Sequence, residues 1–140
     1  MPIPDTSLSP TLDGFVSRSA EATWNDARES TTGDAVYASL TASSVAIRAS
    51  LTGPGRGAGY YVARSFFRFD TSGINFLPKS ALFRVRGHVT SSITVIACVK
   101  ANFGASLTTA DFDAIEGWDH DRNNAGNVTY YASNSSAWST

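Results

Sequence analysis

The stretch Tyr60–Asp70, which reads Tyr-Tyr-Val-Ala-Arg-Ser-Phe-Phe-Arg-Phe-Asp, decides the fold class. It is rich in the aromatic and β-branched residues that favour a pleated strand. Successive side chains of a strand point to opposite faces, so Phe67 and Phe69 are expected on one face and Arg68 on the other. Thr71-Ser72-Gly73 then supplies a turn. We therefore predict a long strand over residues 60–70.

Shorter runs on both sides of this stretch show the same alternation of apolar and polar residues. Ile93–Lys100 differs, because it is apolar on both faces and is therefore expected to be central or covered by a partner. Gly53–Gly59 holds four glycines and one proline, which predicts a mobile loop of a long hairpin. The remaining predicted strands are Gly14–Arg18, Ala35–Ala38, Val45–Leu51, Ala81–Val89 and Asn127–Ala132.

Strands at this spacing, with turns rich in Gly, Ser and Asn between them, predict an all-β fold. The expected architecture is an antiparallel β-sandwich, a jelly roll. A short helix is expected near 108–115, where Thr108 and Asp111 have the spacing of an N-cap and an acidic first turn. Trp24–Glu29 is polar and is predicted to form either one helical turn or a loop.

The composition excludes several function classes. The 140 residues carry a net charge of −1, from 11 basic and 12 acidic residues, so a sequence-wide nucleic-acid footprint or a basic membrane-docking surface is not expected. Only 16% of the residues are charged, against about 25% in an average globular chain, so the surface is polar without being ionic. The single cysteine, Cys98, excludes an intramolecular disulfide and a zinc site built on cysteines.

The two ends of the chain predict a docking arm and an open sheet. Residues 1–11 contain three prolines and are expected to form an extended N-terminal arm that docks on a particle, ahead of a jelly-roll body over 12–140. The start lacks the basic and apolar regions of a secretory signal, and no run of about 18 apolar residues predicts membrane insertion. Trp138–Thr140 follow a loop of Asn and Ser, so we expect a chain that is cut short or completes its sheet with another subunit.

The acidic stretch Asp111–Asp121 is a candidate metal site. Its carboxylates suit a hard divalent cation, and structural calcium is the ion expected if one binds, with no other cofactor. The spacing does not match an EF-hand loop, and a helix cap followed by a solvated loop explains the same residues. The candidate ligands are Asp111, Asp113, Glu116, Asp119 and Asp121.

Catalytic motifs are missing from the sequence. It has no Gly-x-Ser-x-Gly elbow, and Gly53–Gly59 lacks the Gly-Lys-Ser/Thr ending of a phosphate-binding loop. Paired carboxylates for glycoside hydrolysis could be drawn only from the acidic stretch. We therefore expect a protein that is not an enzyme.

Aromatic side chains in predicted loops and strand ends offer a candidate binding surface. Sugar rings present C–H faces that pack on exposed aromatic planes, and Trp and Tyr are common at interfaces. The alternative is that these rings pack over the open ends of the sandwich. The candidate glycan-binding residues are Trp24, Tyr60, Tyr61 and Trp118.

Residues Ala63–Ile74, followed by Ser80–Val85, resemble the jelly-roll domains of the DNRLRE type. These domains are similar to carbohydrate-binding modules and occur in bacterial surface proteins and in phage fibre and other virion proteins. The shared pattern is an aromatic-rich strand ending in Phe-x-Phe-Asp-Thr-Ser, a short connection, and a second strand. The resemblance covers about residues 12–132 and implies a jelly-roll fold, with no catalytic set to carry over.

The leading interpretation is a phage virion structural protein, a fibre or a capsid or tail decoration component. It is expected to be made in the host cytoplasm, to form a homo-oligomer, to dock on other virion proteins, and to be extracellular after lysis, where it could present a surface to host glycans. The alternative is a carbohydrate-binding module that uses the loop aromatics, and a third is a metal-assisted glycan hydrolase at Asp111–Asp121. The candidate interface residues are Ile3, Phe66, Ile96 and Cys98.

Overall fold

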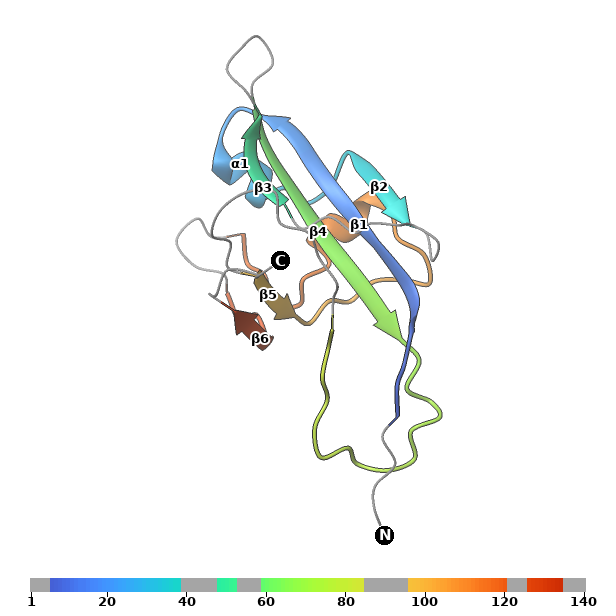
Figure 1. Cartoon of the computed structure of the whole chain (residues 1–140). Coiled ribbons are helices and arrows are strands. Elements are labelled where there is room, and N and C mark those ends of the chain that lie inside the picture. Colours follow the sequence, from blue (N-terminus) through green and yellow to red (C-terminus); the bar gives the residue numbers. More distant parts are fainter. Residues whose placement is uncertain (1–5, 39–47, 53–58, 85–95, 121–125, 135–140) are drawn as a thin grey trace.

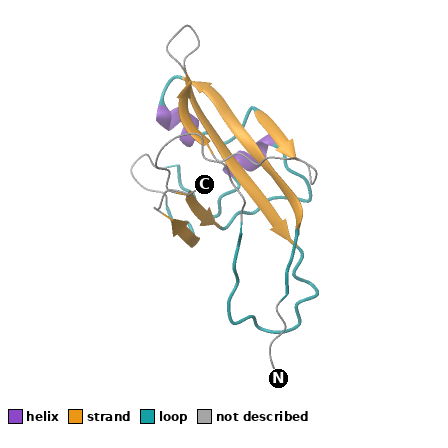
Figure 2. Ribbon diagram, viewed as in Figure 1, coloured by secondary structure: helices purple, strands orange, loops and turns teal. Residues whose placement is uncertain are grey.

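The structure is a computed structural model, which describes residues 6–38, 48–52, 59–84, 96–120 and 126–134. These residues form antiparallel strands with little helix, which confirms the all-β class (Figures 1 and 2). The strands are β1 (Pro10–Glu21), β2 (Ala35–Ala38), β3 (Arg48–Thr52), β4 (Gly59–Phe69), β5 (Ile96–Val99) and β6 (Tyr130–Asn134). The helices are α1 (Trp24–Arg28) and the 3₁₀ helix η1 (Thr109–Asp113).

A four-stranded sheet in the order β2-β1-β4-β3 is the main element, and all its neighbours are antiparallel. Its centre is the long pair β1–β4, in which Val16 lies opposite Arg64. The hairpin β3–β4 closes with Thr52 opposite Gly59, so Gly59 belongs to the strand and not to the predicted loop. Strands β5 and β6 form a separate two-stranded sheet.

The hydrophobic core lies on one face of the four-stranded sheet. Alternation along β4 directs Val62 and Phe66 to this face, where they meet Val16 of β1. Helix α1 contributes Ala27 and η1 contributes the fully buried Phe112, because both helices pack on the central strands. Leu107, in the segment before η1, completes the cluster.

The two predicted helical regions are confirmed as short helical turns. The hydroxyl of Thr23 accepts a hydrogen bond from the Asp26 main-chain N–H at 3.1 Å, which caps α1. Within the predicted helix near 108–115, the Asp111 carboxylate accepts from the Thr108 main-chain N–H at 2.6 Å. Only the helix type was not foreseen, since η1 is a 3₁₀ helix.

One strand prediction is wrong in the part of the chain that the structure describes. Residues 81–84, expected to begin a strand, have no strand structure and pair with none of the described strands. Strand β5, expected to be central or covered by a partner, pairs with β6 alone among the described strands, so its second alternative stays a prediction. Residues 45–47 and 85–95 of the predicted strands lie outside the described ranges.

The ends of the predicted elements also shift. Pro10 and Thr11, placed in the arm by the sequence, belong to β1, and Pro10 lies opposite Phe69. The last strand begins at Tyr130 and not at Asn127. Neither α1 nor η1 has the length or the apolar character to cross a membrane, and no other helix occurs in the described ranges.

Candidate functional site

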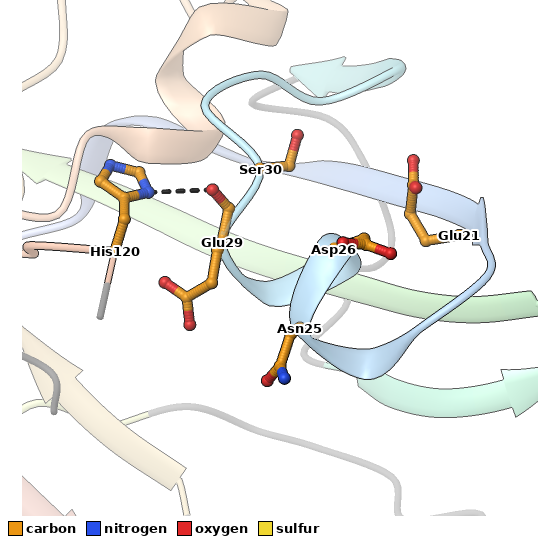
Figure 3. A pocket seen from close by; sticks show the side chains of 6 residues that line it. All are labelled: Glu21, Asn25, Asp26, Glu29, Ser30 and His120. Atoms are coloured by element: carbon orange, nitrogen blue, oxygen red, sulfur yellow. Dashed lines mark hydrogen bonds between the residues drawn. The ribbon is translucent and has the colours of Figure 1, made fainter. Parts of the chain in front are cut away.

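An open hollow of about 470 Å³ beside α1 is the candidate site (Figure 3). Its lining comes from the end of β1, from α1 and the two residues that follow it, and from the loop after η1. Three carboxylates, an amide, a hydroxyl and an imidazole make this lining polar, so it suits a ligand that forms hydrogen bonds. The lining residues are Glu21, Asn25, Asp26, Glu29, Ser30 and His120.

Each of the three carboxylates of the hollow already has a partner. Glu21 accepts from Arg18 Nε at 2.6 Å, and Asp26 accepts from the Thr23 hydroxyl at 2.7 Å. Glu29 forms an ion pair with Arg28, and its second oxygen is buried without a hydrogen-bond partner among the described residues. The hollow therefore offers acceptor atoms whose negative charge is partly compensated.

His120 ties the loop after η1 to the end of α1, as Figure 3 shows for its contact with Glu29. Its Nδ1 lies 2.9 Å from the main-chain oxygen of Glu29, and its Nε2 lies 3.0 Å from Oδ2 of Asp113. A carbonyl oxygen only accepts, so Nδ1 donates. His120 has a φ of 58°, in the left-handed region, and these two contacts stabilise that conformation.

A half-buried arginine, Arg64, joins the sheet to both helices. Arg64 of β4 donates to the main-chain oxygen of Phe112 and, at 2.7 Å, to that of Arg28. Its guanidinium lies 4.2 Å from the Phe112 ring centroid and 5.4 Å from that of Trp118. Burial lowers the pKa of Arg64 to about 10, and the nearby carboxylates of Asp113 and Glu29 oppose that shift.

The structure brings together only two of the four predicted glycan-binding aromatics. Trp24 is 38% exposed, and its ring lies 6.2 Å from that of Tyr60 in an edge-to-face arrangement. Tyr61 follows Tyr60 on β4 and therefore points to the opposite face of the sheet. The Trp118 ring is covered by the guanidiniums of Arg28 and Arg64, and its Nε1 is buried, so this ring is not an open platform.

The predicted metal ligands do not converge in the described part of the chain, where no group of three or more His, Cys, Asp or Glu side chains is placed to hold an ion. Asp111 caps η1, which is the alternative that the sequence left open. Asp113 contacts His120, and Glu116 pairs with Lys100 at 2.8 Å, which raises the pKa of Lys100. Asp119 is exposed, and Asp121 lies outside the described residues.

The interface prediction for Phe66 is wrong, because this side chain is 4% exposed and packs in the chain's own core. The edge of its ring meets Phe103 at a centroid distance of 5.3 Å. Cys98 is half-buried on β5, so it stays a prediction. Ile3 and the side chain of Ile96 lie outside what the structure describes.

Sequence reasoning missed the hollow and several exposed apolar residues. The residues that line the hollow are separated by up to about 100 positions, and sequence reasoning did not connect the polar stretch around α1 with the acidic stretch that contains His120. Leu77, Leu82, Tyr130 and Tyr131 are well exposed but were not singled out. For Leu77 a signal existed, since it precedes Pro78 in a stretch without period-two alternation.

No family model matches the chain, and neither a curated protein nor a solved structure is significantly similar to it. The resemblance of residues 63–74 to the DNRLRE-type domains therefore stays a prediction.

Proposed function

We propose that this chain is a non-enzymatic structural component of a phage virion, which associates with copies of itself and docks on other virion proteins. It is made in the host cytoplasm and leaves the cell with the particle on lysis. The four-stranded sheet is one layer of its jelly-roll body, and β5–β6 belongs to the second. The resemblance at Ala63–Ile74 supports the virion assignment, and the distribution of apolar side chains supports the association.

The observation that carries the proposal is that large apolar side chains lie on the surface more often than in the core. Among the described residues, five large hydrophobic residues and two alanines are buried, while ten large hydrophobic residues are exposed. Burial of apolar area stabilises by about 25 cal/mol per Å², so these exposed side chains favour a partner that covers them. The exposed set is Leu8, Trp24, Val36, Tyr37, Leu51, Leu77, Leu82, Phe83, Tyr130 and Tyr131.

The edges of the sheet support association as well. Within the described strands, β2 and β3 are the outer ones of the four-stranded sheet. Natural edge strands are usually protected by charged residues or proline. Here Tyr37 on β2 is 55% exposed and Leu51 on β3 is 62% exposed, so these edges favour contact with another chain.

Light scattering coupled to size exclusion, over a dilution series, tests the proposal. We expect a dimer or higher oligomer that dissociates only on dilution. A chain that is monomeric at every concentration would contradict the proposed association.

Glycan binding at the hollow is a second candidate function. Trp24 is exposed next to Asn25 and Asp26, so an aromatic plane adjoins hydrogen-bonding groups that suit sugar hydroxyls. Trp24→Ala should then abolish retention on immobilised glycans, while Tyr131→Ala, another exposed aromatic, should leave it unchanged. Equal retention of both variants would remove this candidate.

A further inference from the structure

We propose that residues 70–84, called here the 70–84 arm, form the contact through which the chain binds a second copy of itself. The inference rests on the proposed self-association and names the segment that carries it. The arm leaves the end of β4 and runs beyond the sheet before it turns back, as the green to yellow trace in Figure 1 shows. Loops of this length without helix or strand are uncommon in compact domains and often functional.

The arm exposes side chains that a loop in water normally lacks. Leu77 is 92% exposed and Leu82 is 74% exposed, the two highest values among the exposed large apolar residues of the described chain. Phe83 is 45% exposed. Pro78, directly after Leu77, restricts the backbone there and limits the conformational entropy that binding would remove. The arm is therefore both apolar and partly preorganised.

Contacts at both ends hold the arm in place. At its start, the Asp70 carboxylate accepts from the Ser72 main-chain N–H, and the Ile74 N–H donates to the Thr71 oxygen, both at 2.9 Å. At its end, the Phe83 ring meets Phe67 and Phe69 of β4 at centroid distances of 5.0 and 5.9 Å. The arm is anchored on the sheet face opposite the core, and Leu77 stays free for a partner.

The exposed area matches what a symmetric pair of chains needs. With roughly 200 Å² for a fully exposed side chain of this size, Leu77, Leu82 and Phe83 together offer about 400 Å². If two copies exchange arms, each chain buries about 400 Å² on its own arm and a similar area where it receives the other. The resulting area of about 800 Å² per chain is that of a standard stable interface. A second copy is therefore the occupant that the area favours.

The receiving surface is available on the same chain. Tyr37 on β2 is 55% exposed outside the arm, and its ring stacks on that of Phe15 of β1 at a centroid distance of 4.5 Å, so it offers an apolar surface at this edge of the sheet. Exchange between identical chains needs no other component, because each copy supplies both an arm and a receiving surface.

A matched pair of double variants tests the inference. Leu77→Ser with Leu82→Ser removes the apolar side chains of the arm, and Leu8→Ser with Tyr131→Ser makes a comparable change at exposed positions outside both the arm and the receiving surface. All four side chains are exposed within one chain, so neither variant should disturb the fold, and near-ultraviolet circular dichroism verifies this. Dissociation constants for self-association come from light scattering over a dilution series.

We expect the arm variant to dissociate at a concentration at least tenfold higher than wild type, and the control variant within about threefold of wild type. A wild type that associates and an arm variant that associates equally well would overturn the inference and leave the proposed self-association intact. Self-association that is weakened equally in both variants would also overturn the inference, because the arm would then contribute no more to the contact than other exposed apolar residues. A monomeric wild type would contradict the inference and the proposed self-association together.

Discussion

Replacing Arg64 by methionine tests whether its guanidinium holds the sheet, α1 and η1 together. The guanidinium donates to the main-chain oxygens of Phe112 and Arg28 and packs on the Phe112 ring. Methionine is flexible and apolar and donates no hydrogen bond. Both carbonyls then lose the Arg64 donor, and the carboxylates of Asp113 and Glu29, each with one buried oxygen already unpartnered among the described residues, lose a nearby positive charge.

The expected effect is large. Removing one partner from a fully buried charged network lowers the free energy of unfolding by about 3–5 kcal/mol, and Arg64 is half-buried, so its loss lies at the lower end of that range. We therefore expect Arg64→Met to destabilise the fold by about 3 kcal/mol. Arg68 on the same strand is the matched control, because it is exposed, donates to the Phe103 oxygen at 3.1 Å and lies 5.5 Å from that ring. Arg68→Met should cost less than about 1 kcal/mol.

Equilibrium unfolding in urea, followed by tryptophan fluorescence, measures both differences. All proteins must be compared at one chain concentration, because association shifts apparent stability. A loss below about 1 kcal/mol for Arg64→Met, or a loss equal to that of Arg68→Met, would refute the structural role of the Arg64 guanidinium.

The same variant has a defined pH signature. Burial lowers the pKa of Arg64 to about 10 in the folded chain, well below the ordinary value that the unfolded chain keeps. Below about pH 9, folded and unfolded chains both hold this proton, so Arg64 adds no pH slope to stability. Between the two pKa values the unfolded chain binds more protons, so the contribution of this residue to stability rises with pH there. The difference between wild type and Arg64→Met should therefore be constant from about pH 6 to pH 9.

Three further predictions concern the backbone of β1 and β4 and the turn after β4. Ala20 has a φ of 58°, a left-handed backbone conformation that strains an alanine but not a glycine. Ala20→Gly should therefore stabilise the fold by about 1 kcal/mol and raise the melting temperature. A lower melting temperature would contradict this strain at Ala20. A Cβ at Gly59 would lie 2.6 Å from the Ala20 Cα, so Gly59→Ala should lower the free energy of unfolding by about 1–3 kcal/mol. An unchanged midpoint of urea unfolding would contradict this close approach. The main-chain N–H and the hydroxyl of Ser72 hold the pKa of Asp70 below its ordinary 3.8. The ionised carboxylate therefore adds stability that is fully present above the pKa of the unfolded chain. That stability is lost as the pH falls through the lower pKa of the folded chain. Ser72→Ala should raise the pKa of Asp70 in an NMR titration, and an unmoved titration would show that the hydroxyl plays no part.

The sequence predicts the elements that depend on local pattern. Strand β4 is foreseen almost to its ends because aromatic and β-branched residues alternate along it, and η1 because Thr108 and Asp111 have cap spacing. Residues 81–84 alternate equally well but lack strand structure, because a strand also needs a partner strand beside it and none of the described strands pairs with them. Pairing of this kind is a property of the whole sheet and leaves no local signal.

The site residues are foreseen less well, for a related reason. Phe66 is apolar at a position where the pattern cannot distinguish a core from an interface, and the structure places it in the core. Arg64 has the same parity along β4 as Val62 and Phe66, so alternation alone puts a charged residue on the apolar face. A charged residue at such a position indicates an arginine that is at least half-buried and has hydrogen-bond partners, which the sequence could have shown. The partners themselves come from α1 and η1 and could not be inferred from local sequence.

The two faces of strand β4 have different roles: one packs in the core, and the other contacts the arm that carries the proposed association. Val62, Arg64 and Phe66 point to the core, where Arg64 bonds both helices. Phe67 and Phe69 point the other way and anchor the 70–84 arm through Phe83. Because successive side chains alternate, a change at Arg64 acts on the core, whereas a change at the tip of the arm leaves the core contacts in place. Stability and association should therefore respond to different substitutions, as distant and independent sites do.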